Sequence, residues 1–288
     1  MKLTQATSIH IADIGDAHAI SMKDSVRALK AAGFHYIDAS VNTQTRKEHL
    51  PLALDTWEDF SRDLRAFGDS EGVEFIQSHA FFPVNGPVDK RGWDYENEMV
   101  RRTLISSAIL GVKYIVMHPK RLPEHSPKEA FDFNYEYFCR WAELADQHGI
   151  GIAMENLPPN PAGYRFSVDY HEVLELAKKI GAPHVGMCLD TGHANMVGAD
   201  IPQIIRDAGD LLRATHIQDN FGTRDDHLAP LMGTIKWNEV MRALGDIHYE
   251  HGFTFEIQNI SIRMPASIQQ DLINFSYKLG CYLISLAE

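Results

Sequence analysis

The protein is a chain of 288 residues, 44% hydrophobic and 23% charged, a composition typical of a globular protein that buries a large core. Its formal net charge of −12 repels nucleic acid and anionic membranes, so a polyanionic partner would need a local basic patch. A neutral or cationic small molecule is the partner class that this charge favours.

The three cysteines, Cys139, Cys188 and Cys281, form no CxxC motif, which argues against a disulfide scaffold and against a thiolate zinc site. The first twenty residues lack the continuous apolar segment of a secretory signal, and no run of about 18 apolar residues predicts a membrane span. We therefore expect a cytoplasmic protein with reduced thiols and no membrane partner.

Short β-branched or aromatic runs alternate with amphipathic segments along the chain, a pattern typical of βα units around a parallel sheet. The predicted strands cover residues 8–14, 34–40, 73–80, 112–119, 150–157, 185–190, 214–219 and 253–259. Helices are predicted over 126–149, where Ser126 and Glu129 form a capping box, over 167–181 and over 266–287. Glycines precede several strands, where a turn needs a left-handed residue: Gly33, Gly72, Gly149, Gly181 and Gly252.

Eight strands, each followed by a helix, predict a (β/α)8 TIM barrel, which we expect to form a single domain over residues 1–288. The alternative is a doubly wound open sheet. That fold normally carries a glycine-rich phosphate turn after its first strand, and "IADIGDAH" is not GxGxxG.

In such a barrel, functional residues lie at the carboxyl ends of the strands and in the following loops. Nine good metal ligands occupy these positions: His79, His118, Glu155, Asp190, His193, His216, Asp225, His227 and Glu256. A single histidine near a strand end is more often a hydrogen-bonded rim residue than a ligand, so neither His79 nor His118 indicates a metal on its own.

The carboxylates within the strands are more informative. Glu155 and Glu256 lie in the apolar strands "IAMENL" and "FTFEIQN", and Asp190 ends "VGMCLD". A buried carboxylate needs a cation or a proton, and three at one end of a barrel repel one another, so a divalent cation is the simplest remedy. With His216 they form a set of three oxygen ligands and one nitrogen ligand that suits Mn²⁺, Mg²⁺, Co²⁺ or Zn²⁺.

Other polar residues allow more than one interpretation. Asp38 either binds substrate or caps the following helix, and Cys188 belongs to the core between Met187 and Leu189. His10 is ambiguous because it lies within the first predicted strand. The remaining histidines are interpreted as surface residues: His35, His49, His125, His148, His171, His184, His248 and His251.

Four segments, "AMENLP", "VGMCLDTGHANMVG", "HIQDNFGTRDDH" and "FTFEIQN", resemble the xylose-isomerase-like barrels. That superfamily includes sugar isomerases and epimerases, inosose and dehydroshikimate dehydratases, and apurinic endonucleases of the endonuclease IV type. The resemblance runs from about residue 23 to 286. It implies that the shared metal site falls on Glu155, Asp190, His216 and Glu256, the same four residues that burial selects.

The epimerase-like branch implies that Glu155 and Glu256 also move the proton, one on each face of the substrate carbon. This is chemically reasonable, because a divalent ion makes the C–H next to a ketone or hydroxyl more acidic and a carboxylate can accept the proton. His193 would then bind a substrate oxygen. Arg224 would assist, although its spacing from the histidine differs from that of the epimerase arginine.

The endonuclease branch implies a different use of the nine ligands. One zinc would be held by His79, His118 and Glu155, and a second by Asp190, His216 and Glu256 with Glu155 bridging. The third would be held by His193, Asp225 and His227. Three metals suit phosphodiester hydrolysis. Additional zinc beyond a single divalent ion would therefore depend on His79, His118, His193, Asp225 and His227.

Features outside the ligands favour sugar chemistry. The loops "VDKRGWDYENE", "MENLPPNPAGY" and "GTRDDH" are mixed or acidic, whereas a DNA enzyme needs basic residues along its rim. The usual Pro-Gly-x-Gly turn is replaced by "LAPLMGTIKW", with Met232 in place of a glycine, which puts the third metal in doubt. Phe81, Phe82 and Trp93 would stack on a base or wall a sugar pocket.

We therefore predict a metal-dependent isomerase, epimerase or related dehydratase that acts by proton abstraction on a sugar or cyclitol. The alternatives are an endonuclease IV-like enzyme and a barrel that only binds sugar, although the last leaves the buried carboxylates unexplained. Nucleic acid is not the expected partner, and a homo-oligomer stays open. Substrate contacts are expected from His79, His118, His193, Arg224, Asp225, His227, Trp93 and Phe82.

Overall fold

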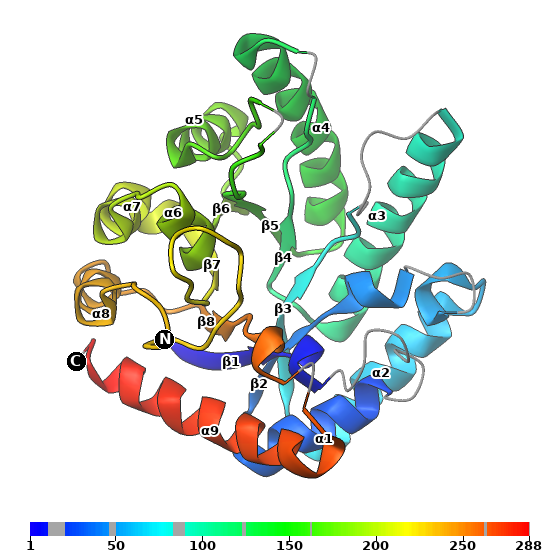
Figure 1. Ribbon diagram of the computed structural model, residues 1–288. Helices are drawn as coiled ribbons and strands as arrows, with labels where there is room; N and C mark the ends of the chain where they lie inside the picture. The colour runs from blue at the N-terminus through cyan, green and yellow to red at the C-terminus, as the bar shows by residue number, and fades with distance from the viewer. Residues whose placement is uncertain are drawn as a thin grey trace.

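The computed structural model describes residues 1–10, 21–45, 50–82, 90–122, 125–161, 163–261 and 264–287. Eight parallel strands form one sheet in the order β7-β6-β5-β4-β3-β2-β1-β8. They are β1 (Lys2–Ala6), β2 (Tyr36–Ala39), β3 (Glu74–His79), β4 (Tyr114–Met117), β5 (Gly151–Glu155), β6 (Val185–Asp190), β7 (Leu212–His216) and β8 (Gly252–Phe255). Figure 1 shows these strands at the centre, surrounded by helices.

The two ends of the sheet meet just beyond β7. Ile217 pairs in parallel with Phe255, its N–H donates to the carbonyl of Thr254 at 2.7 Å, and its own carbonyl accepts from the N–H of Glu256 at 3.0 Å. The sheet thus closes into a (β/α)8 barrel, as the strand and helix pattern predicted. Closure brings the carboxyl end of every strand to the same end of the molecule.

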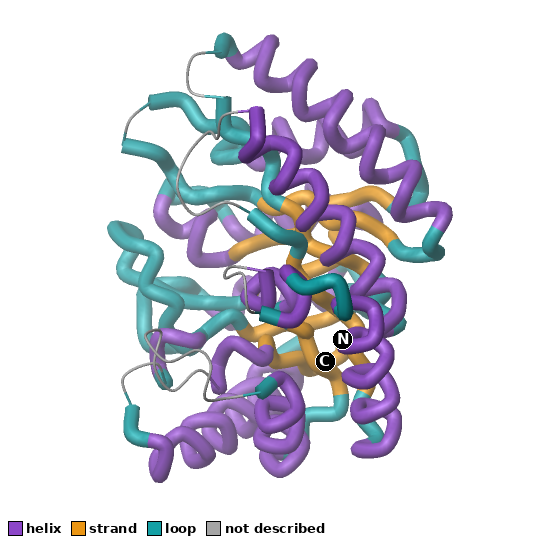
Figure 2. The backbone as a smooth tube through the Cα atoms, turned by 90° about the vertical axis from the view of Figure 1, so that its right-hand side faces the viewer, coloured by secondary structure: helices purple, strands orange, loops and turns teal. Residues whose placement is uncertain are grey.

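The helices surround the barrel, and none of those described combines the length and apolar character needed to cross a membrane. They are α1 (Met22–Ala32), α2 (Trp57–Glu71), α3 (Lys90–Leu110), α4 (Pro127–Gln147), α5 (Tyr170–Ile180), α6 (Thr191–Met196), α7 (Ile201–Ala208), α8 (Trp237–Asp246) and α9 (Ala266–Ser285). Five short 3-10 helices complete the order: η1 (Thr7–His10), η2 (Val41–Thr45), η3 (Pro51–Ala53), η4 (Gly209–Leu211) and η5 (Gln258–Ile260). In Figure 2 the long loops gather on the left, opposite the end where β1 begins.

Local signals placed the start of α4 and the end of α5 correctly, whereas α5 begins at Tyr170 rather than at residue 167. Ser126 caps α4 through the predicted capping box with Glu129, and Gly181 ends α5 in the left-handed conformation with φ of 68°. Gly33, Gly72 and Gly149 also have positive φ.

Gly252 does not follow this rule. It begins β8 and does not have positive φ, and the left-handed residue of that turn is His248, with φ of 52°. A Cβ at position 252 would lie 2.8 Å from Oγ1 of Thr254, so close packing at the base of the barrel explains this glycine.

The predicted first strand over 8–14 is wrong. The strand lies at Lys2–Ala6, residues 7–10 form a 3-10 helix, and residues 11–20 fall outside the described part of the chain. The reason lies in the polar residues of this strand, because Thr4 and Gln5 are both fully buried. Gln5 donates to the carbonyl of Phe255 at 3.0 Å, so its amide is satisfied by the neighbouring strand. A strand with buried polar residues lacks the apolar alternation by which strands are recognised.

Candidate metal centre at the carboxyl ends of the strands

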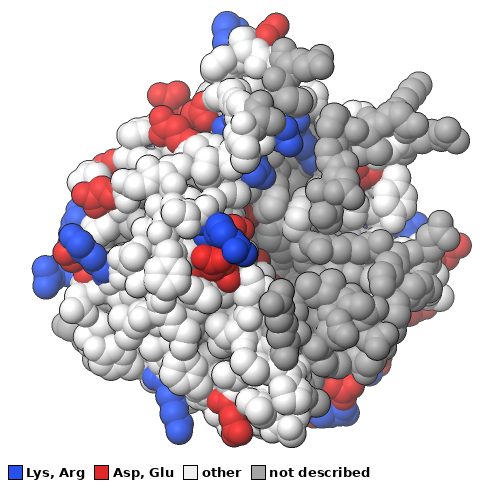
Figure 3. All heavy atoms as spheres, viewed as in Figure 1, with Lys and Arg blue, Asp and Glu red and all other residues white. Residues whose placement is uncertain are grey.

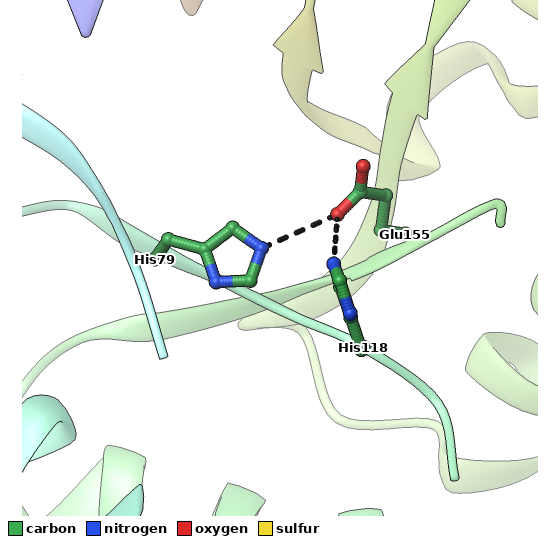
Figure 4. Close-up of side chains that lie close together, drawn as sticks. All are labelled: His79, His118 and Glu155. Atoms are coloured by element: carbon green, nitrogen blue, oxygen red, sulfur yellow. Dashed lines mark hydrogen bonds and ion pairs between the residues drawn. The ribbon is translucent and has the colours of Figure 1, made fainter. Parts of the chain in front are cut away.

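Glu155, the last residue of β5, lies at the centre of the cluster of polar side chains at this end of the barrel. Its side chain is 2% exposed, and Oε2 lies 3.0 Å from Nε2 of His118 and 3.4 Å from Nε2 of His79. Figure 4 shows both imidazoles turned toward this one oxygen. His79 ends β3 and His118 follows β4, so neighbouring strands position the three groups.

The other oxygen of Glu155 faces the opposite side of the barrel. Oε1 lies 3.1 Å from Nδ1 of His216, the last residue of β7, and 3.5 Å from Nδ1 of His193. Nδ1 of His216 also lies 3.3 Å from Oε2 of Glu256, directly after β8. Glu155 therefore connects two groups of possible ligands, one with each carboxylate oxygen.

Asp190 ends β6 and caps α6, because its Oδ1 accepts the N–H of His193 at 2.7 Å. Asn156 aligns this residue by accepting its N–H at 2.8 Å and donating to its carbonyl at 3.0 Å. Nε2 of Gln218 reaches Oδ1 of Asp190 at 3.3 Å and Oδ1 of Asp225 at 2.6 Å. Gly192 makes room for that amide, since a Cβ at this position would lie 2.2 Å from Gln218.

The loop after β7 brings Asp225 and His227 to the same cluster. Oδ2 of Asp225 lies 3.3 Å from Nε2 of His193 and 3.2 Å from Nε2 of His227. Nδ1 of His227 lies 2.8 Å from the carbonyl oxygen of Glu256. His227 has φ of 46°, a left-handed backbone that is uncommon for a side chain of this size. All nine residues selected from the sequence are thus joined in one network.

The charges in this network are strongly coupled. Burial alone would raise the pKa of Glu155, but His216 and His118 outweigh it and hold the pKa of this carboxyl well below its usual range. Burial lowers the pKa of His118 to about 4. Burial also raises the pKa of Asp190 to about 7, with nearby carboxylates adding to the effect of desolvation. Carboxylates in turn raise the pKa of His193 to about 9, against the effect of burial, so the carboxylates and imidazoles of the cluster set one another's charge.

The donor atoms fit a metal ion. Two groups of side chains each bring one ligand atom per residue within 4.8 Å of one another: His79, His118 and Glu155, and Glu155, Asp190, His216 and Glu256. The second is the set selected from burial, with three carboxylates and one imidazole suited to Mn²⁺, Mg²⁺, Co²⁺ or Zn²⁺. His193, Asp225 and His227 do not bring their ligand atoms together within this distance, although Asp225 contacts both imidazoles.

Three residues expected to contact substrate lie in different surroundings. The ring of Phe82 is 4.3 Å from that of His118 and 4.9 Å from that of His79, so it walls the cluster. Trp93, near the start of α3, packs 6.0 Å from the ring of Phe133. The side chain of Arg224 is 83% exposed and its Nε lies 3.5 Å from Asp226.

Sequence reasoning missed Asn156, Gln218 and Arg165. The first two follow strand ends within "MENLP" and "HIQDN", and that position was the available signal. Arg165, in the loop before α5, is close enough to His118, Glu155 and Asp225 to interact with their charges. Its Nε is buried without a hydrogen-bond partner, and sequence gave no sign of this placement.

The remaining polar residues also find their places. Asp38 is buried, bonds Gln77 and interacts with His216 and His79, so it faces the barrel interior rather than capping a helix. Cys188 is in the core as predicted. Five of the eight histidines interpreted as surface residues are exposed: His35, His125, His148, His171 and His248.

The other histidine predictions have mixed outcomes. His184 and His251 are half-buried rather than exposed, because Nε2 of His184 bonds the carbonyl of Ala142 and the ring of His251 packs against that of Tyr114. His49 and the side chain of His10 lie outside the described residues.

The turn after Pro230 departs from the sequence interpretation by one position. Leu231, rather than Met232, has the left-handed backbone that favours glycine, with φ of 71°. Gly233 packs directly on Asp219, since a Cβ there would lie 2.2 Å from Oδ1 of that residue. The turn therefore forms without the glycine that the sequence lacks.

The surface above the site is mixed in charge. On the described part of the face in Figure 3, Lys and Arg side chains are interspersed with Asp and Glu. On this face the described residues show no continuous basic band of the kind that tracks a phosphate backbone.

Comparison with known proteins gives relatives of several kinds. The chain is 30% identical to an uncharacterized protein, MJ1311, of Methanocaldococcus jannaschii, over 67% of each chain. It is 30% identical to D-psicose 3-epimerase of Enterocloster bolteae over 35% of this chain and 33% of the epimerase. It is 23% identical to a probable endonuclease 4 of Mycoplasmopsis pulmonis, over 80% of this chain and 84% of the relative.

Solved structures share the barrel along its whole length. A D-psicose 3-epimerase determined in the presence of D-fructose has a TM-score of 0.76 and 17% identity, covering 99% of each chain. The IOLI protein with a bound zinc atom has a TM-score of 0.76 and 18% identity, covering 99% of this chain and 98% of the other. The family model described as xylose isomerase-like TIM barrel matches residues 26–279. The chain therefore belongs to the xylose isomerase-like TIM barrel family, which confirms the resemblance carried by its four strand-end segments.

Proposed function

We propose that the protein is a divalent-metal-dependent isomerase or epimerase, or a related dehydratase, acting on a sugar or cyclitol. The observation that carries this proposal is the group of three carboxylates and one imidazole within 4.8 Å at the carboxyl ends of β5 to β8. Relatives named as D-psicose 3-epimerase and inosose isomerase support sugar chemistry over other uses of such a site.

In this proposal Glu155, Asp190, His216 and Glu256 hold the ion. When bound, the ion polarises a carbonyl or hydroxyl oxygen of the substrate and so acidifies the neighbouring C–H. His193 would donate to a substrate oxygen, and Phe82 would exclude water on the side of His118. The native ion would be Mn²⁺, Mg²⁺, Co²⁺ or Zn²⁺.

Glu155 and Glu256 are the proposed carriers of the substrate proton, and their surroundings differ. Both oxygens of Glu155 face histidine nitrogens, and the side chain is 2% exposed. Glu256 is 24% exposed and only one of its oxygens faces histidine, so it is freer to accept a proton from carbon. We therefore propose that Glu256 removes the proton and that Glu155 acts on the opposite face.

One observation favours a second candidate, an endonuclease IV-like enzyme with several zinc ions. Glu155 belongs to both ligand groups, as a carboxylate bridging two metals would, and a probable endonuclease 4 aligns over 80% of this chain. His79, His118, His193, Asp225 and His227 would hold the additional zinc. The mixed charge of the face around the site weighs against a DNA substrate.

Turnover in D2O tests the proposal directly. Metal-free protein is reloaded with each of the four ions and incubated with ketoses and inososes, and NMR follows product and deuterium at the reacting carbon. Glu155→Gln and Glu256→Gln are expected to abolish deuterium uptake while circular dichroism stays unchanged. Glu136→Gln, at an exposed site on α4, is the matched control and retains activity.

Two results would overturn the ranking. Activity retained by both variants would exclude proton transfer by these glutamates, and efficient nicking of a duplex at an abasic site in physiological salt would favour the nuclease. Metal content of protein purified without chelator separates the same alternatives. One ion per chain agrees with sugar chemistry, and close to three zinc ions agree with the nuclease.

A further inference from the structure

The outer face of α9 carries an apolar stripe that the barrel does not use. Ile268, Phe275 and Tyr282 are 43%, 40% and 51% exposed, and each is seven residues from the next. Because seven residues make nearly two helical turns, these side chains lie in one line. Single exposed apolar residues are common on protein surfaces, but a line of three large ones marks an interaction surface.

The side of the same helix that faces the barrel already serves the fold. Ile273, Leu279 and Leu283 are buried and belong to the main hydrophobic core. Figure 1 places α9 at the edge of the molecule, beside α1 and α8, with its far side turned away from the barrel. The stripe is therefore available to another molecule without any change in the fold.

Two charges alternate with the apolar residues. Asp271 lies between Ile268 and Phe275, and Lys278 lies between Phe275 and Tyr282. Both are exposed, and within the described part of the chain neither forms a salt bridge. The order along the face is thus apolar, acidic, apolar, basic, apolar.

This order is complementary to itself when reversed. In an antiparallel pair centred on Phe275, Ile268 of one chain lies level with Tyr282 of the other. Asp271 lies within about 1.5 Å along the axis of the opposite Lys278, one residue's rise. A parallel pair would instead place Asp271 beside Asp271 and Lys278 beside Lys278. The charge pattern therefore selects an antiparallel partner with the same sequence.

We propose that the α9 stripe, Ile268, Asp271, Phe275, Lys278 and Tyr282, is the two-fold interface of a homodimer. Such an interface is isologous, so the same patch serves both chains. The helix is about 30 Å long, and its flanks on α1 and α8 add area toward the roughly 1,200 Å² of a specific contact. The active end of each barrel plays no part in this contact.

Sedimentation velocity of the full chain tests the interface. The concentration is about 100 µM, chosen to lie above the Kd expected even of a small interface. The wild-type chain is expected to sediment as a species with twice the chain mass of 32.5 kDa. Phe275→Glu is expected to raise the dissociation constant at least tenfold, because it places two carboxylates at the two-fold axis. Leu54→Glu, at an apolar position outside α9 that is 41% exposed against 40% for Phe275, is the control and leaves the mass unchanged.

A charge reversal makes the test specific for orientation. Asp271→Lys alone and Lys278→Asp alone are each expected to weaken the dimer, and the double variant is expected to restore it. Circular dichroism and thermal melting verify that each variant is folded. A wild-type chain that is monomeric at this concentration, or a dimer that persists in Phe275→Glu, would overturn the proposal. Failure of the double variant to regain the dimer would refute the antiparallel arrangement.

Discussion

Replacing Asp219 by asparagine tests how the loop that carries Asp225 and His227 is held in place. Asp219 is fully buried and its carboxylate accepts four hydrogen bonds. Oδ1 accepts from the N–H of Asn220 at 2.9 Å and of Ile235 at 3.2 Å, and Oδ2 accepts from the N–H of Leu231 at 3.1 Å and the indole of Trp237 at 2.8 Å.

In Asp219→Asn one of the two oxygens becomes an NH2 group, whichever way the amide turns. The two buried N–H groups that this oxygen accepted then face the NH2 group, and each buried N–H without an acceptor costs about 1–3 kcal/mol. Relief from burying a charge offsets part of this cost. We therefore expect the free energy of unfolding to fall by roughly 2–5 kcal/mol, a large share of the 5–15 kcal/mol typical of folded proteins.

Urea unfolding followed by circular dichroism measures this change. Asp226→Asn is the control in the same loop, since its carboxylate pairs with the exposed Arg224 at 3.5 Å and is expected to contribute less than about 1 kcal/mol. A loss below about 1 kcal/mol in Asp219→Asn would refute the view that the loop depends on these four bonds.

Three further predictions concern pH, backbone and metal. Burial raises the pKa of Asp38 from 3.8 to about 6, so the stability that this carboxyl contributes is present below pH 3.8 and is lost as pH rises through 6. In metal-free protein, the free energy of unfolding of Asp38→Asn is therefore expected to rise relative to wild type by on the order of 2–3 kcal/mol between these two pH values. Urea unfolding at several pH values measures this change, and a difference between the two proteins that stays constant with pH would contradict it. Gly33→Ala should lower the free energy of unfolding by about 1–3 kcal/mol more than Gly198→Ala. Both glycines have positive φ, but only at position 33 would the Cβ contact a ring, that of Tyr277 at 2.7 Å. Equal losses of Tm in the two variants would count against this contact. Adding Mn²⁺, Co²⁺ or Zn²⁺ to metal-free protein should raise Tm, and a free ion concentration of 100 times Kd should add about 2.7 kcal/mol to the free energy of unfolding. Glu155→Gln should remove most of this stabilisation. An unchanged Tm in the wild-type protein would argue against the site.

The strand and helix pattern was sufficient to predict the barrel, because most strands bury both faces and their residues are strongly apolar. It failed at β1, where Thr4 and Gln5 are polar but fully buried and Gln5 bonds the carbonyl of Phe255. It failed again at Gly252, where close packing rather than a left-handed turn requires glycine. Periodicity records neither the bond from Gln5 to Phe255 nor the close approach of Thr254 to position 252.

What the sequence by itself determined is the set of candidate ligands. Glu155 and Asp190 are carboxylates at the ends of apolar strands, and in a parallel barrel all such ends meet, so a charged cluster was required before any geometry was known. Only the tertiary structure decided that Glu155 presents one oxygen to His79 and His118 and the other to His216. That division depends on where neighbouring strands end relative to one another.

The loop after β7 was decided entirely by tertiary contacts. Asp225 and Arg224 are neighbours in sequence and equally polar, yet Asp225 reaches two imidazoles while Arg224 extends into solvent. The difference arises because Asp219 and the left-handed backbone of His227 and Leu231 hold the loop in one conformation. Local sequence lists the polar side chains of a loop, but the direction of each is set by the distant groups that satisfy its backbone.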